Sequence, residues 1–231
     1  TVWDYAKARG YVIGENPARL KGHLDKILPK TSKVKRVRHF PALRYEQIGV
    51  FIKKLRNQSG YSALALEFKI LTAVRTGEII GAKWGEIDIK QATWTIPSER
   101  MKAGREHRVP LSSRAIEIIE SIKSNRNLDE HVFKGWKHNT GLSNGAFLAL
   151  IKKMKITGVT PHGFRSTFRD WASEEAHQFP GETIELALAH TIKNKTEAAY
   201  RRGDQLERRR DLMALWEQYI NSNMTRGVQE L

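Results

Sequence analysis

The sequence has 231 residues, which is enough for one domain with a sizeable buried core and part of another. Its 40 lysines and arginines outnumber its 25 acidic residues and leave a formal charge of +15, which predicts a polyanionic partner, with nucleic acid ahead of an acidic membrane surface. The chain contains no cysteine, which excludes disulfides, thiolate zinc sites and a cysteine nucleophile, and no apolar run approaches the roughly 18 residues of a membrane span.

The first forty residues are strongly basic, with ten lysines and arginines against three acidic residues. Trp3, Tyr5 and Ala8 predict one short helix that ends near Gly10. The run 29–38 has no apolar period and is predicted to be a linker. Composition leaves open whether its cations form a solvated tail or a strap that grips DNA.

From Pro41 onward the apolar spacing is mainly helical. Residues 61–74 are apolar on nearly every side, which predicts a buried central helix. Residues 87–89, 92–96 and 108–111 predict three short strands separated by turns. Further helices are expected at 43–57, 113–123, 143–154, 161–176, 183–189, 196–201 and 204–221. The predicted fold class is mainly α with a small antiparallel β-sheet.

The last predicted helix, 204–221, has a narrow apolar face. Leu206, Met213, Trp216 and Ile220 recur along it at helical intervals. Such a face can pack on its own domain or on a neighbouring subunit, and we expect packing on its own domain for a monomer in solution.

Motifs for nucleotide and metal chemistry are absent from the sequence: it has no glycine-rich phosphate loop, no dinucleotide fingerprint, no paired-histidine zinc motif and no clustered acidic motif. Cations and imidazoles instead lie at the ends of predicted helices and in a predicted hairpin turn. Taken singly, each is an ordinary helix-end or turn residue, and an aromatic in a short helix is ordinarily part of a core. The residues concerned are Arg75, Lys102, His162, Arg165, His190 and Tyr200.

Taken in order, these residues resemble the set of the tyrosine recombinase (phage integrase) family. The resemblance runs from about Pro41 to Ile220 and rests on the segments LTAVRTGEIIGAKWGEID, IPSERMKAGREHRVPLS, TPHGFRSTFRDWA and LALAHTIKNKTEAAYRRGDQLERRRDLMALWEQY, which are similar to integrases of satellite phages and genomic islands. It implies the catalytic-domain fold of that family. It also implies that Tyr200 is the nucleophile, that Glu78 supports the first arginine, and that the activating set is Arg75, Lys102, His162, Arg165 and His190.

The implied reaction is transesterification of a DNA phosphodiester, which integrates or excises a mobile element. A phenol attacks phosphorus, the 5′ oxygen leaves, and a 3′-phosphotyrosyl link preserves the bond energy, so no ATP, metal or other cofactor is expected. The guanidiniums of Arg75 and Arg165 suit the charged phosphate oxygens. The resemblance makes Lys102 the acid for the leaving oxygen. It leaves open which histidine is the general base, although His162 is a candidate and His190 is expected to bind a phosphate oxygen.

The resemblance also implies a domain organisation. Residues 1–39 are expected to be the end of a core-binding domain plus a basic linker, 40–221 the catalytic domain and 222–231 a tail. The full-length protein is expected to act as a tetramer on double-stranded DNA in the bacterial cytoplasm, at the nucleoid. Residues 1–231 by themselves are expected to be monomeric, to bind DNA weakly and to retain the tyrosine chemistry. Candidate contacts to the DNA backbone are Lys33, Lys35, Arg36, Arg38, Arg201 and Arg202.

Two positions depart from the family pattern, because Ala73 and Ala189 stand where glycine is common. We expect a little local crowding there and no loss of chemistry. Three other functions remain open from the sequence: type IB topoisomerase relaxation of one duplex, a non-catalytic basic DNA-binding protein of the same fold, and a histidine-based metal nuclease.

Overall fold

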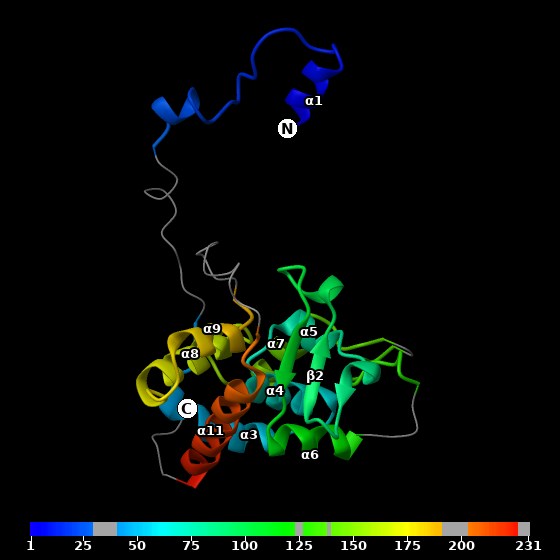
Figure 1. Cartoon of the computed structure of the whole chain (residues 1–231), viewed down its shortest axis with the longest axis vertical. Coiled ribbons are helices and arrows are strands. Elements are labelled where there is room, and N and C mark those ends of the chain that lie inside the picture. Colours follow the sequence, from blue (N-terminus) through cyan, green and yellow to red (C-terminus); the bar gives the residue numbers. More distant parts are fainter. Residues whose placement is uncertain (30–40, 123–126, 138–139, 191–202, 226–231) are drawn as a thin grey trace. The chain divides into compact units, whose positions relative to one another are not determined.

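The computed structural model describes residues 1–29, 41–122, 127–137, 140–190 and 203–225 (Figure 1). The chain divides into two compact units, Thr1–His39 and Phe40–Leu231. The predicted helix at 196–201 and most of the predicted linker at 29–38 lie outside the described residues. So do seven of the predicted site residues: Lys33, Lys35, Arg36, Arg38, Tyr200, Arg201 and Arg202.

The N-terminal unit contains the predicted short helix, α1 (Val2–Ala8). A capping box closes its first turn: the hydroxyl of Thr1 accepts from the backbone N–H of Asp4, and the carboxylate of Asp4 accepts from the amino group of Thr1 at 3.0 Å. A 3₁₀ turn follows at Leu24–Lys26. Within the described residues of this unit, no side chain of α1 is buried.

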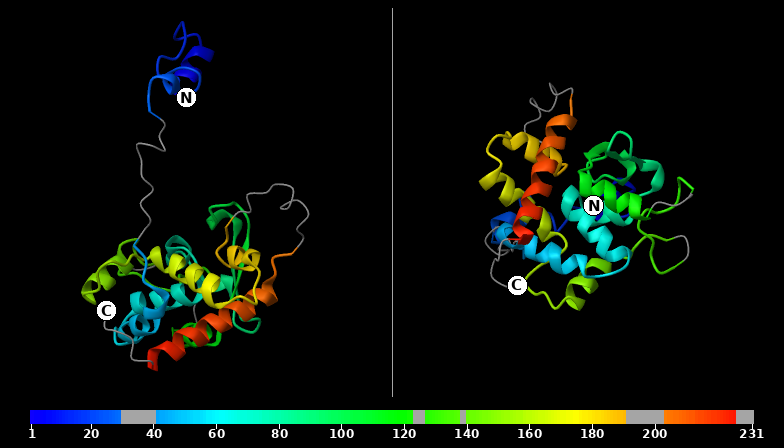
Figure 2. Two further views of the ribbon diagram at one scale, coloured as in Figure 1. Left: turned by 90° about the vertical axis from the view of Figure 1, so that its left-hand side faces the viewer. Right: turned by 90° about the horizontal axis from the view of Figure 1, so that it is seen from below.

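The C-terminal unit is built around α4 (Tyr61–Thr72), which confirms the predicted central helix. Nine of its twelve residues are buried, including Glu67 and Lys69. This helix contacts α3, α5, α6, α7, α8 and α11, and Figures 1 and 2 show it enclosed by other elements. The elements around it are α3 (Ile48–Arg56), α5 (Thr76–Ile80), α6 (Ser113–Ile122), α7 (Ala146–Lys153), α8 (Gly163–Glu175), α9 (Gly181–Ala187) and α11 (Leu206–Thr225), with 3₁₀ turns at Tyr45–Gln47, Trp84–Glu86 and Ser98–Arg100.

A buried carboxylate joins α4 to two neighbouring helices. Glu67 is 2% exposed and accepts from the Nε atom of Arg56 on α3 at 2.8 Å and from the Nε atom of Arg114 on α6 at 2.9 Å. A buried charge is tolerated where partners of opposite charge surround it. These ion pairs therefore fix the positions of α3 and α6 on the central helix.

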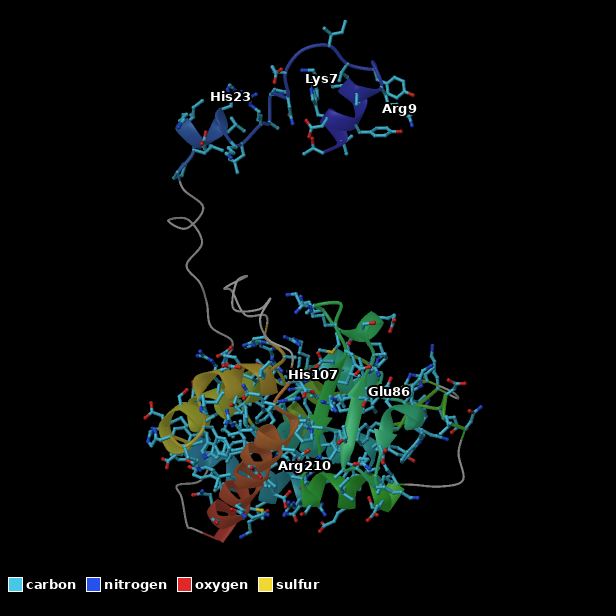
Figure 3. The ribbon with its side chains drawn as sticks, in the orientation of Figure 1. Lys7, Arg9, His23, Glu86, His107 and Arg210 are labelled. Atoms are coloured by element: carbon cyan, nitrogen blue, oxygen red, sulfur yellow. The ribbon has the colours of Figure 1, made fainter. Side chains whose placement is uncertain are left out.

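The three predicted strands form one antiparallel sheet in the order β1-β2-β3. The strands are β1 (Ile87–Asp88), β2 (Thr93–Ile96) and β3 (His107–Pro110). Trp94 lies opposite Ile87 and Val109 and is fully buried. Its indole N–H donates at 2.9 Å to Glu86, which is labelled in Figure 3. The fold class predicted from the sequence, mainly α with a small antiparallel sheet, is confirmed.

The last helix, α11, packs on its own unit, as expected. It lies against α3, β3, α9 and α4 (Figure 2). Its buried face contains Leu212, Met213, Trp216 and Ile220, whereas the predicted Leu206 is only half-buried. The Trp216 indole N–H donates to the carbonyl of Ile70 at 2.9 Å, which ties α11 to the centre of α4.

No helix within the described ranges has the length and apolar content needed to cross a membrane.

Candidate active site

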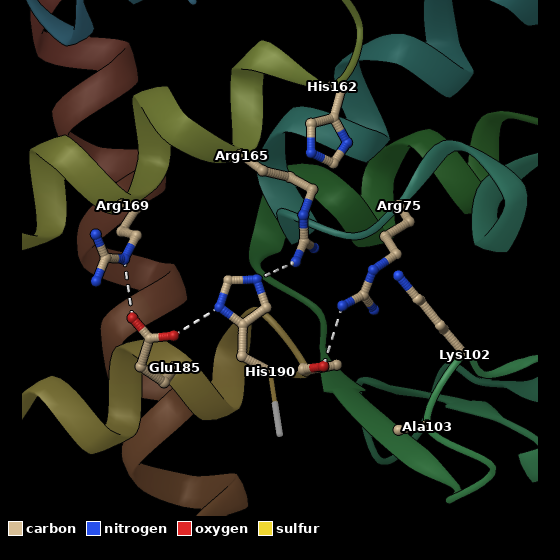
Figure 4. A pocket seen from close by; sticks show the side chains of 9 residues that line it. Arg75, Lys102, Ala103, His162, Arg165, Arg169, Glu185 and His190 are labelled. Atoms are coloured by element: carbon tan, nitrogen blue, oxygen red, sulfur yellow. Dashed lines mark hydrogen bonds and ion pairs between the residues drawn. The ribbon is translucent and has the colours of Figure 1, made fainter. Parts of the chain in front are cut away.

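One pocket of about 720 Å³ brings together five of the predicted site residues (Figure 4). They come from separate segments: the start of α5, the loop between β2 and β3, the start of α8 and the chain after α9. The convergence of positive side chains from such distant segments makes the pocket suited to a phosphate group. Its lining residues are Arg75, Lys102, Ala103, His162, Arg165, Arg169, Glu185, Ala189 and His190.

Arg75 is held by Glu78 at the beginning of α5. Arg75 is the N-cap residue of this helix, and its backbone N–H donates to Glu78 Oε2 at 2.7 Å. The guanidinium Nη1 donates to Glu78 Oε1 at 3.0 Å. Because Glu78 is 3% exposed, this doubly bonded carboxylate fixes both the backbone and the side chain of Arg75.

Arg165 is the most enclosed cation of the pocket, with 5% exposure. Its Nη1 donates to the carbonyl of Ala73 and its Nη2 donates to the carbonyl of Leu188 at 2.6 Å. Burial, together with the nearby charge of Arg75, lowers the pKa of Arg165 to about 10. The guanidinium therefore stays charged at neutral pH and is held by neutral oxygens, without a carboxylate partner within the described part of the chain.

The two arginines are braced by alanine carbonyls in left-handed backbone. Ala73 has φ of 52° and Ala189 has φ of 48°. The carbonyl of Ala73 accepts from Arg165, and that of Ala189 accepts from Arg75 Nη2 at 3.1 Å. A side chain in the left-handed region is strained, and glycine adopts this conformation without that strain, which adds a backbone effect to the expected local crowding.

Lys69 is a buried lysine of α4 that the sequence analysis missed. It is 1% exposed, and its Nζ donates to the carbonyl of Pro161 at 2.6 Å, directly before His162. Burial, and then the charge of Arg165, lowers the pKa of Lys69 to about 7, although Glu78 opposes the shift. The pKa of His162 is also lowered, by burial and by the charges of Arg165 and Lys69.

His190 is bound on both ring nitrogens (Figure 4). Its Nδ1 lies 2.6 Å from Glu185 Oε2, and its Nε2 lies 3.1 Å from Arg165 Nη2. The other oxygen of Glu185 accepts from Arg169 Nε at 2.8 Å. Burial by itself would raise the pKa of Glu185, but the hydrogen bonds to His190 and Arg169 outweigh burial and lower this pKa. The carboxylate of Glu185 is therefore ionised at neutral pH.

Glu185 and Arg169 were not among the predicted site residues. Arg169 follows Arg165 by one turn of α8, and Glu185 precedes His190 by five residues across the end of α9, where the chain direction changes. The signal in the sequence that could have indicated the contact between Glu185 and His190 is a carboxylate a few residues from a candidate histidine.

His107, at the start of β3, was also missed (Figure 3). Burial, followed by the charge of Arg209, lowers its pKa to about 4, and Arg75 and Arg165 add to this effect. The imidazole is therefore neutral at pH 7. Within the described ranges, no group of three or more His, Asp or Glu side chains is arranged to hold a metal ion.

Residues 41–207 match the family model described as the Phage integrase family. The chain belongs to the phage integrase family. Among its relatives, the prophage integrase IntA of Escherichia coli K12 is 34% identical over 189 residues, which cover 80% of this chain and 45% of that protein. The integrase of Enterobacteria phage P4 is 30% identical over 247 residues, which cover 98% of this chain and 54% of that protein.

Solved structures of phage integrases have the same fold. A lambda integrase dimer bound to a COC′ core site has 18% sequence identity and a TM-score of 0.56, and the match covers 82% of this chain and 68% of that one. The chain spans about half the length of the curated relatives it matches.

Proposed function

We propose that this chain is the catalytic part of a site-specific DNA recombinase, which cuts and rejoins duplex DNA through a 3′-phosphotyrosyl intermediate. The observation that carries the proposal is the pocket into which Arg75, Arg165, Lys102 and two histidines converge. Family membership supports it, since the matched relatives are named integrases.

In this function Arg75 and Arg165 bind the non-bridging oxygens of the scissile phosphate. Both guanidiniums are held in place before DNA arrives, Arg75 by Glu78 and both by backbone carbonyls. Preorganised donors stabilise the negative charge of the pentacoordinate transition state without reorganising during the reaction. The neutral partners of Arg165 leave its positive charge available to the phosphate.

Tyr200, which the family resemblance makes the nucleophile, attacks phosphorus with its phenolic oxygen. The bond from phosphorus to the 5′ oxygen breaks, and Lys102 gives that oxygen a proton. An unperturbed phenol has a pKa of about 10, so forming phenolate near pH 7 costs about 4 kcal/mol. A base in the pocket and the nearby cations reduce this cost. Rejoining is the same step in reverse, with a 5′ hydroxyl as nucleophile.

The energy of the broken phosphodiester is kept in the phosphotyrosyl bond, so neither ATP nor a metal ion is required. We expect strand cleavage to proceed unchanged in EDTA. Inhibition by EDTA would instead favour a metal nuclease.

The substrate class is double-stranded DNA, and the excess of 15 positive charges fits this partner. The lambda integrase structures, described as a dimer on a core site and a tetramer on a Holliday junction, support an assembly on DNA for the longer protein. Residues 1–39, as the end of a core-binding domain, would add only part of a DNA-binding surface. We therefore expect the chain by itself to bind DNA weakly and to cleave it without efficient recombination.

Trapping of the covalent intermediate tests the function. The substrate is a pool of nicked duplexes with random sequence around the nick, from which the short cleaved strand diffuses away and prevents rejoining. At low salt, which strengthens phosphate contacts, labelled DNA should stay on the protein in a denaturing gel. Peptide mapping should place the DNA on Tyr200.

Tyr200→Phe should abolish this product, whereas Tyr11→Phe, at an exposed tyrosine of the N-terminal unit, should not. Equal DNA retention by Tyr200→Phe and the unaltered chain would refute the phosphotyrosyl mechanism. Relaxation of a single supercoiled duplex without strand exchange by the longer protein would favour topoisomerase activity instead.

A further inference from the structure

Lys69 is a buried cation that the proposed reaction does not use. It lies on α4, is 1% exposed, and donates from Nζ to the carbonyl of Pro161 at 2.6 Å. Within the described ranges this is its one hydrogen bond, and no carboxylate lies within ion-pair distance of Nζ. A buried amine held by a single neutral carbonyl lowers the free energy of unfolding, so stability does not account for a lysine at this position.

The carbonyl that Lys69 binds belongs to the central peptide of a tight turn. The backbone N–H of Gly163 donates to the carbonyl of Thr160 at 2.9 Å, which closes a turn with Pro161 and His162 at its two middle positions. His162 has φ of −74° and ψ of −33°. Proline at the first middle position and negative φ at the second are typical of a type I turn.

The ends of this turn are attached to the first residues of the C-terminal unit. The backbone N–H and the hydroxyl of Thr160 both donate to the carbonyl of Pro41, at 3.2 and 3.1 Å. A Cβ atom at Gly163 would lie 2.2 Å from the same carbonyl oxygen, so only glycine fits there. The ends of the turn are therefore held without Lys69, and what Lys69 holds is the central peptide.

The central peptide of such a turn has two orientations. Rotation by about 180° converts type I into type II, in which the second middle residue takes positive φ. Histidine is strained there, and the bond from Lys69 adds to the preference for type I. Without that bond the Pro161 carbonyl loses its donor, and this loss is of the same order as the strain of the rotated state. Both orientations would then be populated.

The orientation of this peptide determines where His162 points. The carbonyl of Pro161 and the backbone N–H of His162 form one rigid planar group, so rotation of the peptide redirects the side chain that follows it. His162 lines the pocket together with Arg165 and is exposed (Figure 4). Its position therefore follows from the backbone that carries it more than from packing.

We propose that Lys69 is a positioning residue of the phosphate site, which holds the Pro161–His162 peptide in the type I orientation and keeps the imidazole of His162 turned toward the phosphate. This inference rests on the proposed function, in which the pocket binds a DNA phosphate. It concerns the binding of that phosphate and is independent of which group performs each step of cleavage. Lys69 acts through His162 and does not itself touch DNA.

The charges around Lys69 make phosphate binding sensitive to its proton. The charged and titratable groups of the described chain that act on it are Arg165 and His162 from α8 and Glu78 from α5. Burial, and then Arg165, lowers the pKa of Lys69 to about 7, against the opposing effect of Glu78. A phosphate in the pocket offsets the charge of Arg165 and favours the ammonium form, which also donates the stronger bond to Pro161. Phosphate should therefore bind more tightly at pH 7 than at pH 9.

Dimethyl phosphate, a phosphodiester that stays singly charged from pH 7 to pH 9, is the binding probe. In NMR titrations Lys69→Met should bind it about three- to tenfold more weakly than the unaltered chain at pH 7, and this ratio should shrink by pH 9. Lys69→Gln, whose amide nitrogen is one bond short of the Nζ position, should behave in the same way. Lys53→Met, the same change at an exposed position on α3, is the matched control and should bind as the unaltered chain does.

Backbone NMR reports the turn directly. The Hα atom of Pro161 and the backbone N–H of His162 come closest when the peptide is rotated, so their NOE should be weak in the unaltered chain and strong in Lys69→Met. Urea unfolding separates positioning from damage to the fold. The affinity for dimethyl phosphate should fall in Lys69→Met although its free energy of unfolding at pH 7 is not reduced.

A double-mutant cycle shows whether Lys69 acts through His162. In the background of His162→Gln, Lys69→Met should have no further effect on the affinity for dimethyl phosphate. An equal loss in both backgrounds would show that Lys69 acts by its charge alone and would overturn the proposal. So would an affinity of Lys69→Met within about twofold of the unaltered chain at pH 7, or an unchanged NOE.

Failure of the unaltered chain to bind dimethyl phosphate would instead refute the phosphate site of the proposed function. The NOE in Lys69→Met would still decide whether Lys69 holds the turn.

Discussion

Replacing Lys69 by methionine should stabilise the protein at neutral pH. The Lys69 side chain is 1% exposed, and burial lowers its pKa from 10.5 to about 7. In the unfolded chain the ammonium is solvated and keeps its proton up to pH 10.5. Between these values the unfolded state binds more protons than the folded state, so the free energy of unfolding rises with pH across this window.

The size of the effect follows from the two pKa values. At about 1.36 kcal/mol for each pKa unit, burying Lys69 destabilises the folded state by about 4 kcal/mol at pH 7 and by about 1 kcal/mol at pH 10. Methionine removes this cost but leaves the carbonyl of Pro161 without the 2.6 Å bond from Nζ, a loss of about 1 kcal/mol. Lys69→Met should therefore be more stable than the unaltered chain by about 3 kcal/mol at pH 7 and about equal to it at pH 10.

Urea unfolding at pH 7 and pH 10, followed by tryptophan fluorescence, measures this difference. Groups that titrate in both proteins cancel when the two are compared. Lys53→Met on the exposed face of α3 is the control and should show no change of the difference with pH. A stability difference for Lys69→Met that is the same at both pH values would show that Lys69 is not a buried titrating group.

Three further predictions concern the pocket and its supports. Arg165→Lys removes the bonds to two backbone carbonyls and the paired donors for phosphate, so covalent-complex formation should fall by about 10²–10³-fold in the gel assay. Ala189→Gly relieves the left-handed strain at φ of 48°, about 1–2 kcal/mol, against about 0.4–1 kcal/mol of added unfolded-state entropy, so Tm should rise by a few degrees; a lower Tm would refute the strain. Asp204→Ala removes the carboxylate that Arg108 and the buried Arg209 share, and should lower the free energy of unfolding by about 1–3 kcal/mol. Burial by itself would raise the pKa of Asp204, but Arg108 and Arg209 outweigh burial and lower this pKa. The stabilisation by Asp204 is therefore complete above about pH 4 and is lost in acid. An acid titration of the unaltered chain and of Asp204→Ala would detect this loss.

The main elements of the fold could be predicted from the sequence because their patterns are local. The continuous apolar run of α4 and the period-two strands determine their own structure, and both were found near their predicted positions. The buried face of α11 was harder to predict. The buried face contains Leu212 in place of the predicted Leu206. Leu206 is the first residue of the helix and is only half-buried there.

The sequence indicated which residues line the pocket, but it did not predict most of the hydrogen bonds between them. Arg75 and Glu78 lie three residues apart at the start of a helix, so their pairing follows from sequence spacing. The contact between Arg165 and His190 depends on how α8 and α9 pack, and no local pattern encodes it. Lys69 stands inside an apolar run, where a lysine gives no indication that its ammonium reaches a carbonyl 92 residues away.

The left-handed alanines were identified as departures from the family pattern, but their consequence was not foreseen. Ala73 and Ala189 are small, and the sequence suggested only that a methyl group replaces a hydrogen. The structure shows left-handed backbone at both positions, a conformation that glycine adopts without strain. Backbone dihedrals of this kind are set by the turn that each helix end makes, so they require the three-dimensional structure.

Each of the two guanidiniums is held by a backbone carbonyl from a remote segment, so the proposed phosphate site depends on both parts of the chain. Arg165 depends on a carbonyl at the end of α4, and Arg75 depends on a carbonyl 114 residues further along the chain. If the protein were divided into two polypeptides between α6 and α8, neither half would contain both arginines with the carbonyls that hold them. Complementation of the halves would restore both braces together, so the trapped DNA adduct would serve as a reporter of their association.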